Sequence, residues 1–143
     1  MTPATLSATV TRVAKEDPRI LAVYLYGSRS RGEERPDSDV DVGVLYRDPV
    51  DVLELLDFES RLQAELGLRV QAVDVGRCSA FLAFDVISGE RLYCTDSTRC
   101  DEFDLYVMRR AGDLLPFERE RMRMVLSGEG LRSIESLAGR GEA

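Results

Sequence analysis

The sequence predicts an α+β protein, with a small mixed β-sheet and helices packed on it. Segments rich in β-branched and aromatic residues recur along the chain, at residues 20–26, 39–46 and 68–75. Segments with apolar residues at helical spacing alternate with them, at residues 3–14, 52–66 and 97–110. Few strands interleaved with helices are typical of this fold class.

The chain has 143 residues, which is the length of one domain. Apolar residues make up 44% and charged residues 31%, an ordinary balance for a soluble globular protein. The last residues are dominated by Gly, Ser, Glu and Arg, which predicts a frayed end. We therefore expect one domain over residues 1–126, C-terminal helices included, and a flexible tail over residues 127–143.

The first helix and the first strand are separated by a proline. Apolar residues at helical spacing follow Pro3, and Pro18 ends this pattern. Residues 20–26 (ILAVYLY) then predict a buried strand. Residues 27–38 (GSRSRGEERPDS) predict a polar connection rather than a further element, because glycine and proline punctuate them.

The second strand is predicted by strict alternation over residues 39–46 (DVDVGVLY). Successive side chains of a strand point to opposite faces, so Asp39, Asp41 and Gly43 share one face and the valines share the other.

A long amphipathic helix and a third strand follow. Asp48-Pro49 marks the expected helix start, because proline fits the first turn of a helix. Gly67 marks the expected end. Residues 68–75 (LRVQAVDV) alternate again, and they predict a strand that carries Asp74.

The rest of the chain, to about residue 126, is mostly helical in pattern. Residues 79–88 favour a short helix capped by Gly89 and followed by a small strand at 91–94, and a β-hairpin at the same glycine is the alternative. Residues 97–110 predict another helix. Pro116 is expected to begin a further helical piece, to about residue 126.

The chain has no histidine, which excludes Ser-His and Cys-His nucleophiles and every metal site built on imidazole. Acidic residues number 26 and basic residues 19, and the net charge of −7 argues against direct nucleic-acid binding. The three cysteines form no C-x-x-C pair, which suits reduced thiols in the cytoplasm. No signal peptide or long apolar run is found, so we expect a cytoplasmic protein that does not bind membranes.

Three acidic side chains are the candidate catalytic and metal-binding residues: Asp39, Asp41 and Asp74. The first two lie roughly 7 Å apart along one face of a strand. If the third predicted strand neighbours the second, all three carboxylates converge. Such a cluster repels itself unless a divalent cation neutralises it. Two Mg²⁺ ions about 3.5–4 Å apart could then clamp the attacking and leaving oxygens of a phosphoryl or nucleotidyl transfer.

The connection before these carboxylates has the features of a phosphate-binding loop. Gly27 directly follows a strand, where the absence of a side chain lets the backbone approach a phosphate. A helical turn after it would offer free N–H groups, and the Ser28 hydroxyl adds a donor. Arg29 is a further candidate phosphate ligand, although arginine in a loop is usually only solvated surface.

Simpler interpretations of the same residues fit the sequence less well. An EF-hand requires glycine at position six of its loop, where Val42 stands, and glutamate at position twelve, where Asp48 stands. A P-loop requires Lys-Ser or Lys-Thr where Glu33-Glu34 stand. Alternating Asp and Val on a solvated edge strand remains the simplest alternative for the aspartates, and the preceding Gly-Ser pair argues against it.

The spacing of these residues resembles the signature of the polymerase-β-like nucleotidyltransferases. That signature is Gly-Ser, ten residues, then D-x-D, and here it reads Gly27-Ser28 through Asp39-Val40-Asp41. The minimal-nucleotidyltransferase form adds a second glycine, Gly32, and a Ser-Asp pair, in which Ser38 precedes the first aspartate. The stretches at 89–93 and 103–117 further resemble MntA-type antitoxins of HEPN/MNT toxin–antitoxin systems.

The resemblance implies a nucleotidyltransferase fold with ATP as donor and Mg²⁺ as cofactor. It implies that AMP is transferred to a tyrosine hydroxyl of a partner HEPN-type toxin, which the protein thereby neutralises. It also implies that Gly27 and Ser28 contact the nucleotide triphosphate, and we expect Arg29, Gly32 and Ser38 to contribute to the same nucleotide site. A third carboxylate on a later strand completes the site in this family, and Asp74 matches it by position.

Two other functions stay open on the sequence alone. One is a binding module that neutralises the toxin by occlusion. The other is a nucleotidyltransferase that modifies a small molecule or an RNA end. A chain of 143 residues leaves little room for the extra domain that such enzymes carry, so a protein acceptor is favoured. The assembly is expected to be either a homodimer or a hetero-oligomer with the toxin.

Overall fold

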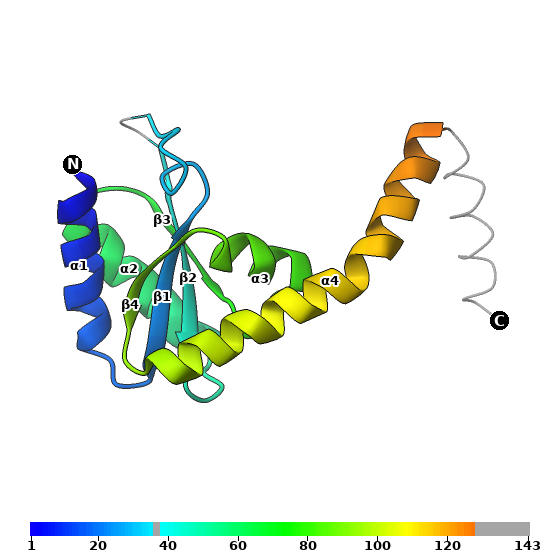
Figure 1. Ribbon diagram of the computed structural model, residues 1–143. Helices are drawn as coiled ribbons and strands as arrows, with labels where there is room; N and C mark the ends of the chain where they lie inside the picture. The colour runs from blue at the N-terminus through cyan, green and yellow to red at the C-terminus, as the bar shows by residue number, and fades with distance from the viewer. Residues whose placement is uncertain (36–37, 128–143) are drawn as a thin grey trace. The chain divides into compact units, whose positions relative to one another are not determined.

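We describe a computed structural model of the chain, in which residues 1–35 and 38–127 are described (Figure 1). The elements follow the predicted order of helices and strands. They are α1 (Pro3–Lys15), β1 (Ile20–Tyr26), β2 (Val40–Tyr46), α2 (Val52–Leu66), β3 (Val70–Asp74), α3 (Ala80–Ile87), β4 (Glu90–Cys94) and α4 (Ser97–Ser127). Within the described residues, no helix is long and apolar enough to cross a membrane.

The four strands form one mixed sheet in the order β3-β2-β1-β4. β1 pairs antiparallel with both β2 and β4, whereas β2 pairs parallel with β3. The antiparallel pairing of β1 and β2 brings the end of one strand beside the start of the other, with Tyr26 opposite Asp41. Residues 27–38 therefore connect two strand ends at the same edge of the sheet (Figure 1).

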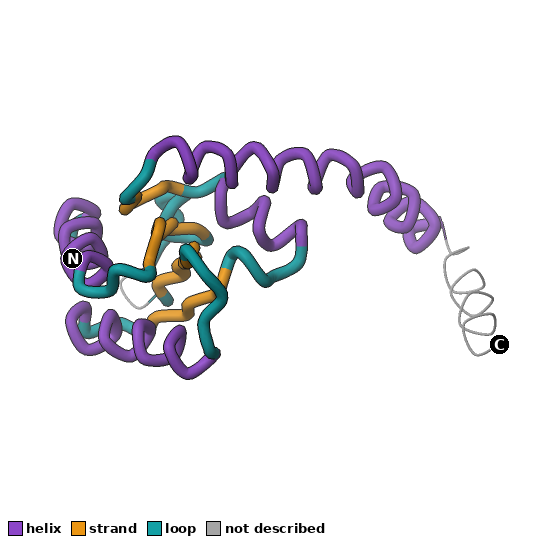
Figure 2. The backbone as a smooth tube through the Cα atoms, turned by 90° about the horizontal axis from the view of Figure 1, so that it is seen from below, coloured by secondary structure: helices purple, strands orange, loops and turns teal. Residues whose placement is uncertain are grey.

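Helices cover both faces of the sheet, with α1 and α2 on one face and α3 and the first turns of α4 on the other (Figure 2). The first face packs on an apolar cluster that includes Val10, Phe58 and Leu62. The second packs on a cluster that includes Val86 and Cys100. All seven residues of β1 are buried, as expected for a strand covered on both sides.

The start of α2 differs from the prediction at Asp48-Pro49. Asp51 is the N-cap, and it forms a capping box in which its backbone N–H donates to Glu54 Oε2 (3.2 Å) and its side chain accepts from Leu53 N (3.3 Å). A carboxylate that satisfies free N–H groups fixes a helix start more strongly than a nearby proline does. The predicted end is confirmed, because Gly67 adopts the left-handed conformation (φ +67°).

The segment at 79–88 is the predicted helix rather than a hairpin, but Ser88, not Gly89, caps its end. Gly89 instead allows a close approach, because a Cβ there would overlap the carbonyl oxygen of Leu25 in β1. The following strand, β4, forms as predicted.

The chain divides into two compact units, residues 1–108 and the residues from 109 onward, so that α4 contributes to both. The predicted break before Pro116 is wrong, because α4 continues through this proline. Proline removes only its own N–H and crowds the carbonyl four residues earlier, which here belongs to Gly112, the residue with the most adaptable backbone. The domain boundary at 126 stays a prediction, and the predicted tail lies outside the described residues from 128 onward.

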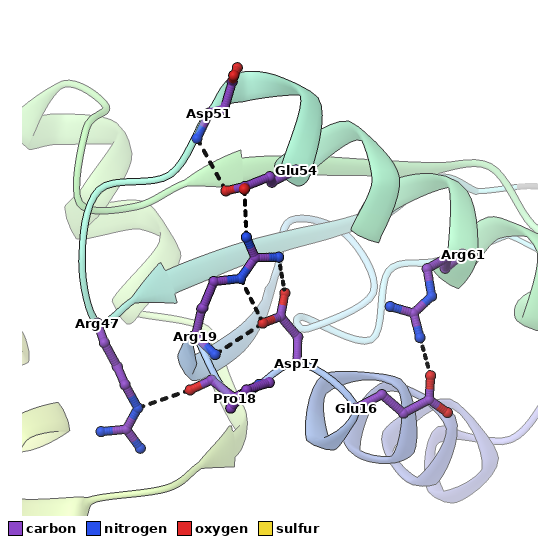
Figure 3. A network of polar contacts seen from close by, with 8 residues as sticks. All are labelled: Glu16, Asp17, Pro18, Arg19, Arg47, Asp51, Glu54 and Arg61. Carbon is purple, nitrogen blue, oxygen red and sulfur yellow. Dashed lines mark hydrogen bonds and ion pairs between the residues drawn. The ribbon is translucent and has the colours of Figure 1, made fainter.

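A polar network fixes the edge of the sheet where β1 begins and β2 ends (Figure 3). Arg19 donates to the Asp17 carboxylate (3.0 and 2.9 Å) and pairs with Glu54 (2.5 Å). Arg47 Nε donates to the carbonyl oxygen of Pro18 (3.1 Å). These contacts join the turn before β1 to the start of α2, and they leave the opposite edge of the sheet to the loop at 27–38.

Candidate active site

Gly27 lies directly against Asp41, at the edge where β1 ends and β2 begins. It adopts a left-handed conformation (φ +75°), and a Cβ at this position would overlap Asp41 Oδ2. Both requirements exclude any residue with a side chain. Gly27 and Asp41, which the sequence motif separates by thirteen residues, are therefore in contact in the fold. The Gly27 backbone packs against the Asp41 carboxylate.

The loop that starts at Gly27 forms a compact turn, in which the carbonyl groups of its first two residues accept hydrogen bonds from residues later in the loop. Ser30 donates to the Gly27 carbonyl through both its backbone N–H (3.2 Å) and its hydroxyl (3.0 Å). The Ser28 carbonyl accepts from the N–H groups of Arg31 (3.2 Å) and Glu33 (2.9 Å). Among the described residues, no acceptor takes up the N–H groups of Ser28 and Arg29. They remain available to an anion, as a phosphate-binding turn requires.

Arg29 and Ser38 tie the two ends of this loop together. The Arg29 guanidinium donates from Nε (3.1 Å) and Nη2 (2.9 Å) to the Ser38 carbonyl. The Ser38 hydroxyl accepts from the backbone N–H of Arg35 (2.7 Å). Gly32 has a positive φ (+71°) with open space around it, so glycine is favoured there by the backbone conformation of the turn and not by a close neighbour. In the structure these three predicted nucleotide ligands shape the loop, and their contact with nucleotide stays a prediction.

Asp39 and Asp41 flank the first residue of β2 and point to the face away from α1 and α2. Val40 and Val42, which alternate with them, are buried in the cluster under those helices. Both aspartates are half-buried. The Gln71 amide of β3 donates from Nε2 to Asp39 Oδ2 (3.3 Å). The predicted pairing of these two carboxylates on one face is confirmed by the geometry.

Asp41 carries an unfavourable charge in this position. Burial is the largest cause that raises the pKa of its carboxyl above the ordinary value, and repulsion from Asp39 and Asp85 adds to it. Arg31 opposes this effect and lowers the pKa. A bound cation would relieve both the burial and the repulsion. The pair of carboxylates therefore suits Mg²⁺, which prefers one or two carboxylates together with water and phosphate oxygens.

Asp74 does not join this pair, and the expected convergence of three carboxylates is wrong. The parallel register of β2 and β3 sets Asp74 opposite Val44, three residues beyond Asp41 and so roughly 10 Å along the strand. Its side chain shares the face of Val44, which lies in the other core cluster. There its Oδ1 accepts from Gly76 N (3.1 Å), and Arg77 lies 4.0 Å away.

The described residues contain no group of three or more His, Cys, Asp or Glu that could hold a metal ion. The residue of β3 that does lie in register with Asp41 is Gln71. Alternation along β3 was visible in the sequence, but the register against β2 was not, and register decides which polar side chain faces the aspartates.

Asp85 of α3 is a second residue that the sequence did not single out. Its charge raises the pKa values of Asp41 and of Tyr26, whose own pKa rises to about 12 chiefly through burial. Gly43 holds α3 close to the sheet, since a Cβ there would overlap Val86 Cγ1. No sequence pattern links α3 to the D-x-D segment, so only the packing of α3 on β2 reveals this acidic neighbour.

The arrangement can position a phosphorylated ligand between a turn of free N–H groups and two carboxylates. The turn would bind phosphate oxygens, and Asp39 and Asp41 would hold the divalent cation that a polyphosphate carries. The cation would neutralise charge that develops on the phosphates during transfer. This chemistry is nucleotidyl or phosphoryl transfer.

Two solved structures have the same fold as this chain. One is a toxin–antitoxin crystal structure with AMP-PNP, with a TM-score of 0.74 and 22% identity, covering 84% of this chain and 98% of that one. The other is the tri-AMPylated Shewanella oneidensis HEPN toxin in complex with MNT antitoxin, with a TM-score of 0.72 and 20% identity, covering 87% and 99%. At these identities the likeness shows the fold alone.

Two relatives are similar in sequence. The protein adenylyltransferase MntA of Shewanella oneidensis is 25% identical over 127 residues, which are 88% of this chain and 87% of that protein. A Methanocaldococcus jannaschii protein, provisionally named a protein adenylyltransferase, is 29% identical over 62 residues, or 43% of this chain. The match spans 63% of the length of that second relative.

One protein family matches a segment of the chain that contains the loop, both aspartates and the whole sheet. The family described as "Polymerase beta, Nucleotidyltransferase" matches residues 8–98, which is more than half of the chain. This range runs from α1 to the first turn of α4 and includes every residue of the candidate site. The chain belongs to the polymerase beta nucleotidyltransferase family.

Proposed function

We propose that the protein is a Mg²⁺-dependent adenylyltransferase that transfers AMP from ATP to a tyrosine hydroxyl of a HEPN-type toxin and thereby acts as its antitoxin. The observation that carries this proposal is the contact between Gly27 and Asp41, which joins a turn with free N–H groups to a pair of carboxylates. A solvated edge strand would need neither the glycine nor the half-buried aspartates.

In this proposal the loop binds the triphosphate and the aspartates bind the cation. Ser28 and the free N–H groups beside it hold phosphate oxygens, while Arg29 keeps the loop in the required shape. Asp39 and Asp41 would hold Mg²⁺, which neutralises charge on the triphosphate when bound. Asp74 has no part, because it lies on the other face of the sheet.

The transfer forms one bond and breaks one. The tyrosine oxygen attacks the α-phosphorus, the bond from this phosphorus to the bridging oxygen of pyrophosphate breaks, and the hydroxyl proton is released to solvent. Positioning and electrostatic stabilisation provide most of the rate enhancement in such a reaction. The chain needs no histidine for this chemistry, in agreement with its composition.

The nature of the acceptor is supported by the relatives and by the charge of the chain. The Shewanella oneidensis relative is a protein adenylyltransferase, and one structure of the same fold contains a tri-AMPylated HEPN toxin with its antitoxin. ATP as donor is supported by the structure of the same fold with AMP-PNP. A net charge of −7 disfavours an RNA acceptor, which would meet repulsion.

The proposal is tested with a HEPN-type toxin as the acceptor. The two proteins are mixed with Mg²⁺ and ATP, or with GTP, CTP or UTP, and the intact mass of the HEPN protein is measured. We expect added AMP with ATP alone, and no addition by the double variant Asp39→Asn/Asp41→Asn. Asp57→Asn, an exposed residue of α2, is the matched control and is expected to behave as wild type.

Neutralisation of the toxin separates catalysis from occlusion. Growth is measured in cells that express the HEPN protein with wild-type chain or with the double variant. If the double variant restores growth as well as wild type while it adds no AMP, neutralisation does not depend on AMP transfer, and the proposed antitoxin mechanism is refuted in favour of occlusion.

A further inference from the structure

We infer that Gln71 is a positioning residue for the Asp39 carboxylate, and that its neutral amide limits the nucleotide-loaded site to one tightly held divalent cation. This inference rests on the proposed function, since it concerns the same pair of aspartates. The sequence predicted two cations, because Asp74 was expected to supply a third carboxylate. The structure places Gln71 there instead, and a single cation is therefore expected.

Gln71 is the third polar side chain of the site, beside Asp39 and Asp41. It is the second residue of β3, it lies in register with Asp41, and its neighbours Val70 and Ala72 face the opposite core cluster. Its side chain therefore points to the face that carries the aspartates. A carboxylate at this place would complete a triad, and the sequence has an amide there.

The amide orients Asp39 through a defined hydrogen bond. Gln71 Nε2 donates to Asp39 Oδ2 (3.3 Å), which leaves Oδ1 for a cation. Asp39 precedes the first residue of β2, so its own backbone lies just outside the strand. Among the described residues, Gln71 is the one hydrogen-bond donor to this carboxylate. Partners that orient a metal ligand are typically worth about tenfold or more in metal affinity.

The charge of the site favours one cation. Two carboxylates match the charge of one divalent ion, and a second ion about 3.5–4 Å away would need further anionic ligands. Asp74 cannot supply one from the other face of the sheet. Asp85 repels Asp41 through space, but it is an exposed residue of α3 and not of the sheet edge. The triphosphate then shares its oxygens with a single protein-held ion.

Cation stoichiometry tests this inference directly. Mn²⁺ is titrated into a concentrated equimolar mixture of the full chain and AMP-PNP, free Mn²⁺ is measured by electron paramagnetic resonance, and a titration of AMP-PNP alone corrects for Mn²⁺ bound by free nucleotide. We expect one tight Mn²⁺ for wild type, and two for Gln71→Glu, which has nearly the same shape and adds a carboxylate. Gln71→Leu should keep one ion at about tenfold weaker affinity. Ser60→Glu adds the same charge on the exposed side of α2 and should match wild type.

Three outcomes would overturn the inference. These are two tight ions in wild type, an unchanged affinity in Gln71→Leu, or a loss of one ion in Asp85→Asn. Thermal unfolding without ligands shows that each variant is folded before it is titrated. The inference fails separately from the proposed function. Two tight ions with normal AMP transfer would refute the role of Gln71 alone, whereas one tight ion without any transfer would refute the adenylyltransferase proposal alone.

Discussion

At the scale of the residue, Asp41 shows a conflict between stability and function. Burial and the charges of Asp39 and Asp85 raise the pKa of its carboxyl, so the folded chain without a bound cation disfavours the ionised form. Gly27 leaves the carboxylate open on one side, because a side chain there would overlap Asp41 Oδ2. A site that is unfavourable for the empty protein and favourable with a cation is typical of a binding function.

We expect Asp41→Asn to stabilise the protein while it abolishes AMP transfer. A carboxyl whose pKa is raised on folding opposes folding when ionised, so wild-type stability falls as pH rises through that raised pKa. The variant should lack this loss, and at pH 7 without Mg²⁺ its Tm should rise by on the order of 2 °C. Thermal unfolding of both proteins at pH 4 and pH 7 measures this difference in Tm. A lower Tm for the variant at pH 7 would contradict this explanation of the pKa shift.

At the scale of the element, strand alternation and loop composition were sufficient to predict most of the site. Alternation put Asp39 and Asp41 on one face, and a glycine after a buried strand located the turn. The role of Asp74 could not be predicted, because alternation alone does not define the register between β2 and β3. The start of α2 was missed because a capping carboxylate outweighs the local preference of proline, and the passage of α4 through Pro116 was missed because the backbone of Gly112 accommodates the proline.

The loop between β1 and β2 depends on Arg29 for its shape. We expect Arg29→Ala to increase trypsin cleavage after Arg31 several-fold, because two hydrogen bonds to the Ser38 carbonyl are lost. AMP-PNP affinity should fall roughly fivefold, since the free loop must be ordered on binding. Limited proteolysis and calorimetric titration measure the two effects.

The exposed Arg99 of α4 provides the matched control, and Arg99→Ala should change neither measurement. Weaker binding with unchanged cleavage would instead show that Arg29 contacts the nucleotide directly.

At the scale of the whole molecule, the first unit is held together by contacts far apart in the sequence. The buried Tyr24 hydroxyl of β1 donates to Asp104 Oδ1 of α4 (2.6 Å), and Arg91 of β4 lies 3.5 Å from the same carboxylate. Burial raises the pKa of the Asp104 carboxyl, and the bond from Tyr24 opposes that shift. This network joins α4 to the sheet on the face that also carries Asp41.

We expect Tyr24→Phe to lower the free energy of unfolding by about 2 kcal/mol, because a half-buried carboxylate loses a hydrogen-bond donor. Tyr46→Phe is the matched control. Its hydroxyl is buried without a hydrogen-bond partner among the described residues, so removal should be neutral or slightly stabilising. Urea unfolding monitored by circular dichroism compares the two. Equal losses in both variants would show that the Tyr24–Asp104 bond adds nothing.

The transfer of AMP, and not of phosphate, is the central claim, and the position of the label in ATP tests it most directly. The full chain is incubated with Mg²⁺, a HEPN-type toxin and ATP labelled with ³²P at either the α or the γ phosphate. We expect the toxin to acquire label from α-labelled ATP alone, and to acquire none with Asp39→Asn/Asp41→Asn. Label from the γ phosphate, or α label transferred by the double variant, would contradict the assignment of these two aspartates to nucleotidyl transfer.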